Sequence, residues 1–374
     1  MIQEVEEIKD ICPPATTENY GSFTQGAAYS LLAKLYLNAE AWGVTFSGNA
    51  YQKVIDNCDK VMAMGYILEP NWKDNFSVTN ENSKEAILAA TFSSSDTGND
   101  GNVKNELHNN TLHYKDYLSL GITASGTWNG ICAQPEYVRL FDEEDARLDG
   151  TFLTGLMIDK STGKPIMTDH NNELNHTIDV NMIPGMEYDG TNWSAVEQHD
   201  GARCFKWEFA SDLTSSMGND FHIFRLADVY LMKAEALAYK GGAVELDEAV
   251  DLVSKTYDRA NPSLAAGSLK GQYKSQSEII DLVLLERQRE FLFEGKRYFD
   301  LLRRLRRSGD LTDIINNYLA NRYKAMTTMQ ESVYKSKLSD IEAFYLPINQ
   351  DELKLNTLLK QNRFYMTSSD ISKK

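Results

Sequence analysis

The chain has 374 residues, of which 42% are hydrophobic and 25% charged, a composition typical of a globular protein with enough residues for a sizeable core. The 54 acidic residues outnumber the 38 basic ones. The resulting net charge of −16 argues against nucleic acid as a partner, because the phosphates would be repelled. No stretch of the sequence approaches the roughly 20 apolar residues that are needed to span a bilayer.

Two helices are predicted near the N-terminus. Residues 22–42 are rich in Ala and Leu at near-helical spacing, and residues 51–65 place their apolar side chains on one stripe of a helix. Gly65 closes the second helix, and Pro70 follows shortly after it. The short polar segment between the two helices predicts that they pair as an αα-hairpin.

The character of the sequence changes between residues 91 and 224. Segments such as "STGKPIMTDHNNELN" are dense in Gly, Asn, Asp and Ser, which is typical of loops. Three of the five tryptophans lie here: Trp128, Trp193 and Trp207. Long loops that carry aromatic side chains on a rigid frame commonly bind ligands, although each tryptophan could equally anchor its loop to the core.

A second helix pair is predicted after this segment. Residues 225–240, "RLADVYLMKAEALAYK", combine an apolar stripe with small residues, and residues 246–260 form the answering helix after the turn "GGAVE". Small residues at such positions let helices approach closely, as in tetratricopeptide-type pairs. The sequence therefore predicts a mostly α fold of stacked helix pairs with a loop-rich insert.

Residues 286–304, "ERQREFLFEGKRYFDLLRR", place charges beside an apolar stripe at helical spacing, with Gly295 expected to allow close helix contact. Glu290 and Glu294 could be read as a catalytic carboxylate pair, which would have to face a cleft. Ion-pair networks are the more common source of such clusters, and charges near a core must be paired. We interpret the segment as structural and expect Arg297 to be the partner of Glu294.

Three segments together resemble the SusD/RagB family of glycan-binding outer-membrane lipoproteins. They are "FRLADVYLMKAEAL", the 286–304 segment, and "YLPINQDELKLNTLLKQN" near the C-terminus. Weaker matches are "GAAYSLLAKLYLNAEAW" with "SKEAILAATF", and "TWNGICAQPEYVRLFDEEDARLDGTF"; all of them follow the family's order along nearly the whole chain. In the C-terminal segment, Asn356, Gln361 and Asn362 are expected to bond backbone groups and pin an irregular tail.

The resemblance implies one SusD-like domain over residues 1–374, with tetratricopeptide-like stacked helix pairs. Helix pairs would occupy 1–90, a loop-rich, ligand-facing insert 91–224, and helix pairs with the C-terminal signature tail 225–374. The family begins with a signal peptide and a lipidated cysteine, whereas Cys12 in "IKDICPP" has no apolar run before it. We therefore expect that the N-terminal start of the domain is missing from this chain.

The resemblance also implies a function. It predicts a non-catalytic protein at the surface of the outer membrane that captures oligosaccharide for import through a SusC-like TonB-dependent transporter. Two alternatives remain open. A carbohydrate-active hydrolase is disfavoured because paired-acid motifs are absent, and a helical-repeat adaptor that binds protein is mildly disfavoured by the aromatic loops. The sequence does not identify the glycan, and it leaves open peptide or glycoprotein as the ligand.

No metal or cofactor is expected. Cys12, Cys58, Cys132 and Cys204 show neither CxxC nor zinc-ligand spacing, and the six histidines form no HExxH motif. The sequence leaves open whether the cysteines are buried thiols or form disulfides. No Gly-rich loop lies between a strand and a helix as phosphate-binding loops do, and no GxSxG nucleophile elbow occurs.

The best candidate ligand site lies within "YKDYLSLGITASGTWNG". Sugar recognition requires flat apolar faces together with amides and charges that hold hydroxyl groups. This stretch supplies Tyr114, Lys115, Tyr117, Trp128 and Asn129. The resemblance places this stretch near the ligand-facing loops. Trp128 could instead be a packing anchor for the following helix, since tryptophan is buried on average. Trp193 is the second choice for a stacking ring and Trp72 the third.

Overall fold

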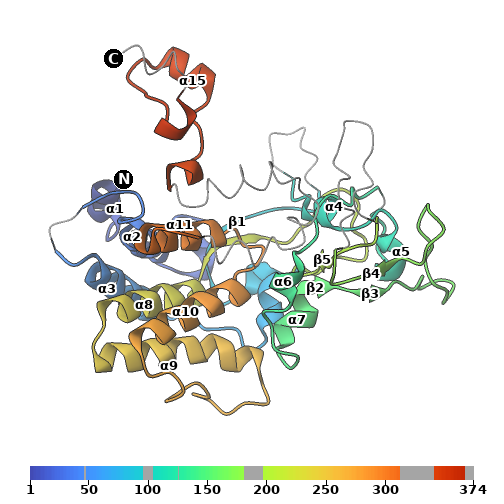
Figure 1. Cartoon of the computed structure of the whole chain (residues 1–374), viewed down its shortest axis with the longest axis horizontal. Coiled ribbons are helices and arrows are strands. Elements are labelled where there is room, and N and C mark those ends of the chain that lie inside the picture. Colours follow the sequence, from blue (N-terminus) through green and yellow to red (C-terminus); the bar gives the residue numbers. More distant parts are fainter. Residues whose placement is uncertain (46–47, 96–103, 125, 181–196, 312–340, 367–374) are drawn as a thin grey trace. The chain divides into compact units, whose positions relative to one another are not determined.

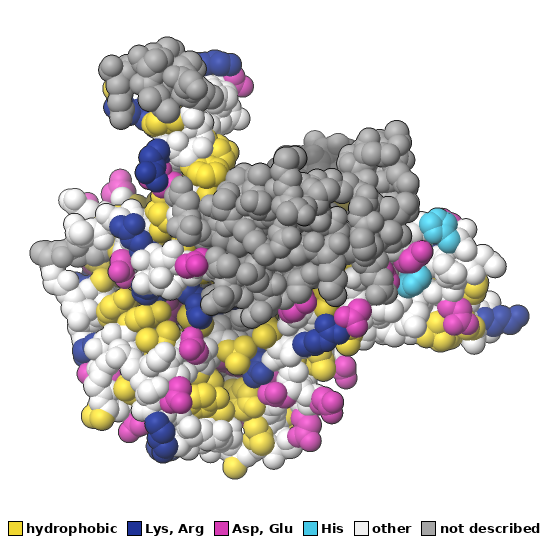
Figure 2. All heavy atoms as spheres, in the orientation of Figure 1, with side chains coloured by type: hydrophobic (Ala, Val, Ile, Leu, Met, Phe, Trp, Pro, Cys, Tyr) yellow, Lys and Arg dark blue, Asp and Glu magenta, His cyan; other side chains and the backbone are white. Residues whose placement is uncertain are grey.

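The computed structural model describes residues 1–45, 48–95, 104–124, 126–180, 197–311 and 341–366 (Figure 1). The chain forms two compact units. The first comprises Met1–Asn181 and Val196–Arg297, and the second comprises Met182–Ala195 and Tyr298–Lys374. On the described part of the face drawn in Figure 2, acidic and basic side chains are interspersed with apolar ones.

The helical part of the first unit is a stack of helix pairs. Its helices are α1 (Ile2–Ile8), α2 (Gln25–Asn38), α3 (Ala50–Met62), α8 (Leu226–Lys240), α9 (Ala243–Ala260) and α10 (Gln276–Glu290). Helix α2 packs against α3, α3 against α8, and α8 against α9 and α10, as Figure 1 also shows. The predicted stacking of helix pairs is confirmed. Within the described ranges, no helix is both long and apolar enough to cross a membrane.

Local signals in the sequence set the bounds of these helices. The side chains of Thr24 and Asn49 accept hydrogen bonds from backbone N–H groups in the first turns of α2 and α3. Ser275 and Glu278 form a capping box at the start of α10. Gly65 adopts a φ of +87° just after α3 ends, so the predicted stop signal is confirmed.

The main hydrophobic core lies between these helices. Ala227, Ala234 and Ala238 on α8 are completely buried, and so is Val253 on α9. The small side chains allow the neighbouring helices to pack closely against α8, which is why this helix tolerates burial on nearly every face.

The loop-rich insert consists of short elements. Its helices are α4 (Leu107–Thr111), α5 (Asp116–Leu120), α6 (Pro135–Val138) and α7 (Ala146–Thr151), and short 3-10 helices before it are η1 (Thr17–Asn19), η2 (Trp72–Phe76) and η3 (Asn80–Asn82). The strands are β1 (Ala86–Ala90), β2 (Phe152–Leu153), β3 (Gly155–Leu156), β4 (Asn175–His176), β5 (Arg203–Cys204) and β6 (Phe221–Arg225). They pair antiparallel as β1 with β6, β2 with β5, and β3 with β4. Because β1 precedes the insert and β6 ends it, their pairing ties the two ends of the insert together at the start of α8.

Two tryptophans lie in a second core under the insert. Trp207 is 2% exposed, stacks on Phe221 with ring centroids 5.8 Å apart, and meets Phe76 edge-on at 5.3 Å. Trp207 therefore anchors its loop to the core, as one of the two readings expected. Trp72 is buried in the same cluster, so its ring is not available as a binding platform.

The four cysteines are free thiols. Cys58 and Cys204 are buried, and burial raises the pKa of Cys204 to about 12. Such a thiol is inert at neutral pH because the reactive thiolate is not formed.

The segment 286–304 is not one helix, so this part of the prediction is wrong. Helix α10 ends at Glu290, and α11 (Arg297–Ser308) begins only after a turn. In that turn Phe293 and Gly295 adopt left-handed backbone conformations, with φ of +66° and +72°. A Cβ added at Gly295 would meet no atom within 4 Å. The glycine is required by its φ angle and not, as expected, by close helix contact.

The described end of the second unit is a short irregular tail. It contains η4 (Ile341–Phe344), α15 (Gln350–Leu355) and η5 (Arg363–Tyr365). The Gln361 side chain bonds both the N–H and the carbonyl of Ile348, each at 2.8 Å, and Asn362 donates to the carbonyl of Leu346 at 2.6 Å. Asn356 accepts from a backbone N–H as well, so the predicted pinning of the tail is confirmed.

Candidate functional site

The backbone around Trp128 is fastened to the C-terminal end of α4. The N–H of Trp128 donates to the carbonyl of Asn109 at 2.7 Å, and the N–H groups of Gly130 and Ile131 donate to the carbonyl of Asn110 at 2.9 and 2.8 Å. The last carbonyls of a helix have no partner within the helix, so they are free to hold a neighbouring segment. Three bonds within four residues fix the position from which the indole ring projects.

The indole ring itself is open to solvent. Trp128 is 59% exposed, and Ile131 beside it is 50% exposed. The alternative that Trp128 is a buried packing anchor is therefore wrong. An exposed aromatic face on a rigid segment can stack on the C–H surface of a ligand, with little conformational entropy lost on binding.

Asn129 is held tightly by its neighbours. It adopts a left-handed φ of +52°, a conformation that asparagine tolerates better than most residues. Its side-chain oxygen accepts from Arg203 Nη2 at 2.7 Å, and its Nδ2 donates to the carbonyl of Gln198 at 2.9 Å. Since an amide offers two donors and two acceptor lone pairs, at most one of each is left for a ligand after these bonds.

Tyr114 and Lys115 converge on one carboxylate. The Tyr114 hydroxyl lies 2.8 Å from Asp169 Oδ2 and 2.5 Å from Gln198 Oε1, and Lys115 Nζ lies 2.7 Å from Asp169 Oδ1. Hydrogen bonds from Lys115 and Tyr114 lower the pKa of Asp169. Partial burial and Asp169 raise the pKa of Tyr114 to about 12, so the phenol remains protonated and able to donate at neutral pH.

Buried side chains pack against the Tyr114 ring and hold it in place. The ring of His113 lies against it, with centroids 3.9 Å apart. One oxygen of the Asp116 carboxylate accepts a hydrogen bond from the backbone N–H of His113 at 2.8 Å. His176 Nε2 lies 2.8 Å from the other oxygen. Burial lowers the pKa of His113 to about 4, so this ring is neutral at physiological pH and acts as a fixed support.

The structure thus brings together four of the six predicted residues. Asn129 and Tyr114 both bond to Gln198, Lys115 joins Tyr114 through Asp169, and Trp128 precedes Asn129. Tyr117 differs, because on α5 it packs partly buried against the second core. Trp193 lies outside the described residues.

Sequence reasoning missed three residues that organise the site. They are Asp169, Gln198 and Arg203. They lie 54 to 84 residues from the predicted site residues that they contact, inside stretches whose composition predicts only loops. No local spacing in the sequence could have linked them to Trp128.

The carboxylates that could be read as a catalytic pair are in the core and fully ion-paired. Arg225 donates to Glu85 and Glu290 at 2.7 Å each, and to Glu294 at 2.7 and 2.9 Å. Lys206 Nζ is 2.6 Å from Glu294. The structural interpretation of the segment is supported, but the expected partner is wrong: Glu294 pairs with Arg225 and Lys206, not with Arg297.

Two further arginines extend this buried network of ion pairs. Arg147 donates to Asp145, Glu286 and Glu290, and Arg259 donates to Glu85 and Glu290. All of these groups are almost inaccessible to water. Burial alone would raise the pKa of Glu290, but Arg259, Arg225 and Arg147 lower it below its usual value, so the carboxylate is ionised.

Comparison with known proteins gives a consistent result. The sequence model of the SusD family matches residues 84–365. The SusD-like protein P38 of Formosa agariphila is 32% identical over 108 residues, which are 28% of this chain and 21% of that protein. The match thus spans about a fifth of the curated relative's length.

Solved structures share the fold at low sequence identity. A SusD superfamily protein from Parabacteroides distasonis aligns with a TM-score of 0.66 and 20% identity, covering 97% of this chain and 68% of that one. Surface glycan-binding protein A from Bacteroides uniformis aligns with a TM-score of 0.61 and 19% identity, covering 96% and 67%. At this level of identity, the similarity establishes the architecture.

Proposed function

The chain belongs to the SusD family, and from this premise we propose that it is a non-catalytic protein that binds oligosaccharide at the cell surface. A similar solved structure carries the name surface glycan-binding protein, and that name supports the proposal by analogy of fold. The ligand site that we propose comprises Trp128, Asn129, Tyr114 and Lys115. Trp193 stays a predicted further member, whereas Tyr117 packs against the second core.

The observation that carries the proposal is the exposed ring of Trp128 on a backbone fastened to α4. Pyranose rings present flat C–H faces that stack on aromatic side chains, while their hydroxyl groups both donate and accept hydrogen bonds. The remaining capacity of Asn129, together with Tyr114, Lys115 and Asp169, supplies donors and acceptors within the same cluster.

The absence of catalysis is part of the proposal. It is supported by the place of Glu290 and Glu294, which are buried and bonded to cations in the core and do not face a cleft as a catalytic pair would have to. Incubation with a bound oligosaccharide should leave the glycan intact. Turnover that disappears when one carboxylate is replaced would contradict this.

The proposal extends to a partner and a location. We propose a SusC-like TonB-dependent transporter as the acceptor of the glycan and the outer-membrane surface as the location, both by resemblance to the family. Co-purification of a TonB-dependent transporter with the protein from its native membranes would test the partner, and protease accessibility on intact cells would test the location.

Glycan binding is tested by isothermal titration against a panel of oligosaccharides. Trp128→Ala should weaken binding by about ten- to a hundredfold, or about 1–3 kcal/mol, because the stacking face is lost. The melting temperature of the Trp128→Ala variant should hardly change, since the indole ring is exposed. Trp42→Ala, which removes a ring that is 46% exposed in the helical part, is the matched control and should bind normally. Equal affinity of both variants would place the glycan elsewhere.

A further inference from the structure

A cavity lies at the C-terminal end of α5. It has a volume of about 380 Å³, near the lower end of the range of roughly 300–1,000 Å³ that is common for small-molecule sites. Its walls come from η2, the end of α5, Lys160 and the segment 205–209 that follows β5. We call it the α5 pocket. None of the residues proposed for glycan binding lines it.

One part of the wall of the α5 pocket is apolar. Phe205 and Phe209 meet edge to face, with ring centroids 5.9 Å apart, and both side chains are partly exposed. Leu120 and Ile122 add aliphatic side chains from the end of α5 and the turn after it. Two aromatic rings with free surface favour a ligand that has a flat apolar body.

Lys73 brings a half-buried ammonium group to the same pocket. Its Nζ donates to the carbonyls of Gly150 and Phe205 at 2.6 and 2.5 Å, and it forms no ion pair with a carboxylate among the described residues. Burial lowers the pKa of Lys73 to about 8, so the group is still mostly protonated at pH 7. An ammonium group has three N–H donors, and the two carbonyls occupy two of them.

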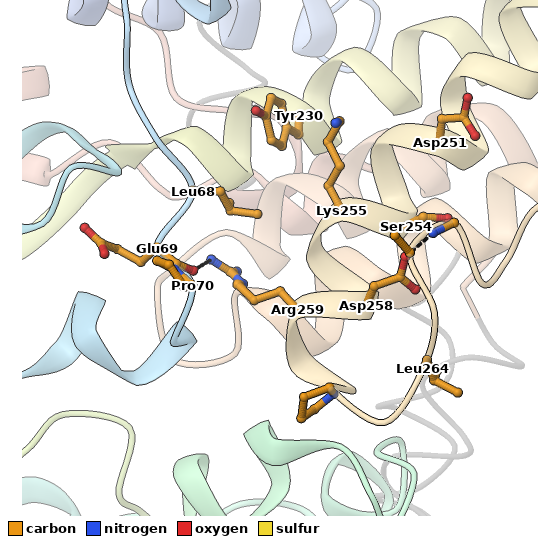
Figure 3. A pocket seen from close by; sticks show the side chains of 13 residues that line it. Leu68, Glu69, Pro70, Tyr230, Asp251, Ser254, Lys255, Asp258, Arg259 and Leu264 are labelled. Atoms are coloured by element: carbon orange, nitrogen blue, oxygen red, sulfur yellow. Dashed lines mark hydrogen bonds between the residues drawn. The ribbon is translucent and has the colours of Figure 1, made fainter.

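Comparable cations elsewhere in the first unit have counter-ions. A carboxylate oxygen lies 2.6, 2.6 and 2.9 Å from the Nζ atoms of Lys206, Lys233 and Lys296. A larger cavity beside α9 is drawn in Figure 3, and the arginine in its wall, Arg259, is paired with Glu85 and Glu290. Lys73 differs from these groups, because the carboxylate that would complete its environment has to come from a ligand.

Lys160 supplies a second ammonium group on an exposed part of the wall. Its Nζ donates to the carbonyl of Leu120 at 2.7 Å. The side chain runs close over Gly121, where an added Cβ would meet Lys160 Cδ at 3.0 Å. The hydrogen bond and this packing hold the ammonium group at the end of α5, and two of its three N–H groups are left for a ligand.

Two carboxylates also line the α5 pocket, and both are exposed. Asp74 accepts from Asn71 Nδ2 at 2.7 Å, and Glu208 accepts from the backbone N–H of Val78 at 2.9 Å. Water and salt screen exposed charges, whereas a partly buried charge such as that of Lys73 is screened much less. An anionic group beside the two lysines is therefore attracted more strongly than the two carboxylates repel it.

We propose that the α5 pocket binds a small aromatic monocarboxylate. The ring of the ligand packs against Phe205 and Phe209. Its carboxylate accepts from Lys160 and Lys73 and becomes the counter-ion of the half-buried ammonium group. The proposal rests on this pocket alone and does not depend on glycan binding at the Trp128 site.

The test is a titration of the full chain with four probes, followed by saturation-transfer NMR of the probe. The first probe, 3-phenylpropionate, has both the ring and the carboxylate. In 3-phenylpropionamide the charge is removed, in 3-phenylpropylamine it is reversed, and in acetate the ring is missing. We expect 3-phenylpropionate to bind saturably, with a Kd at least about tenfold lower than that of each other probe, because only this probe satisfies both parts of the wall.

Two variants locate the binding. Lys73→Met and Lys160→Met each remove one ammonium group and should raise the Kd of 3-phenylpropionate by roughly three- to tenfold. Lys164→Met is the matched control, because this exposed lysine lies four residues after Lys160 and does not line the pocket. It should bind with the affinity of the parent, and so should Trp128→Ala. Near-UV circular dichroism verifies the fold, and Lys160→Met removes only an exposed side chain.

Three results would overturn the proposal. They are the absence of saturable binding of 3-phenylpropionate, an equal Kd for the amide or the amine, and a Kd in Lys160→Met that equals the Kd in Lys164→Met. Glycan titrations of the same variants should match those of the parent, so a failure at the α5 pocket is distinguished from a failure at the Trp128 site.

Discussion

Glu294 illustrates how a single charged residue is accommodated in the core of this protein. Burial alone would raise its pKa, but Arg225 and Lys206 lower the pKa below its usual value. The ionised carboxylate therefore belongs to the folded state. Removing it leaves Lys206 without a carboxylate partner among the described residues, in a place that water hardly reaches.

We expect Glu294→Ala to lower the free energy of unfolding by about 3–5 kcal/mol, because a buried charge loses its counter-ion. Glu248→Ala is the matched control. It breaks an ion pair with Lys233 in which the carboxylate is 43% exposed, and it should cost less than about 1 kcal/mol. Urea denaturation of both variants measures the difference. A loss at Glu294 as small as the control's would contradict its role in the network.

At this scale the sequence predicts some side chains better than others. The sequence left open whether Trp128 is an exposed stacking ring or a packing anchor, and the structure shows an exposed ring. The hydrogen bonds of the Asn129 side chain could not be predicted, because its partners Gln198 and Arg203 lie 69 and 74 residues away. A side chain whose bonds are non-local carries no signature in its own neighbourhood.

Among the elements, the helices of the stack were predictable and the break between α10 and α11 was not. Periodicity, caps and stop signals are local, so α2, α3 and α8 fall close to their expected ranges. In residues 291–296 the apolar spacing continues without interruption. Phe293 takes a left-handed conformation that its residue type disfavours, so tertiary packing overrides the local preference.

The turn gives a direct test through Gly295. Gly295→Ala should lower the free energy of unfolding by about 1–2 kcal/mol, because an L-residue is strained at a φ of +72°. A clash contributes nothing, since an added Cβ has open space. Gly295→Asn should cost less, because asparagine tolerates this conformation better. Chemical denaturation compares the two variants; an alanine variant as stable as the parent would exclude conformational strain.

On the scale of the whole molecule, buried titratable groups couple stability to pH. The cations around them lower the pKa of Glu85, Glu290 and Glu294 in the folded state, against the burial that would raise it. Burial lowers the pKa of His108 and His113 from 6.5 to about 4. In both cases the unfolded chain binds more protons than the folded one, so stability falls as pH falls.

The expected profile has two stages. Between pH 6.5 and about 4 the unfolded chain protonates its histidines while His108 and His113 resist, and each contributes a loss of up to about 3 kcal/mol. Below pH 4.5 the paired carboxylates add a steeper loss. Urea midpoints measured across this range give the profile.

A variant separates the two stages. His108 has no hydrogen-bond partner at either ring nitrogen within the described parts of the chain, so His108→Leu should fold. It should flatten the first stage and leave the second unchanged. A first stage of undiminished slope in this variant would show that His108 does not contribute to it.

The buried charge network also bears on the order in which the chain is synthesised. Glu85 bonds to Arg225 and Arg259, which are translated 140 and 174 residues later, and Arg147 waits 143 residues for Glu290. Until the segment around residue 290 has left the ribosome, Arg147 lacks Glu286 and Glu290, and Arg225 lacks Glu290 and Glu294. The charge network of the first unit can therefore be completed only after most of the chain has been synthesised.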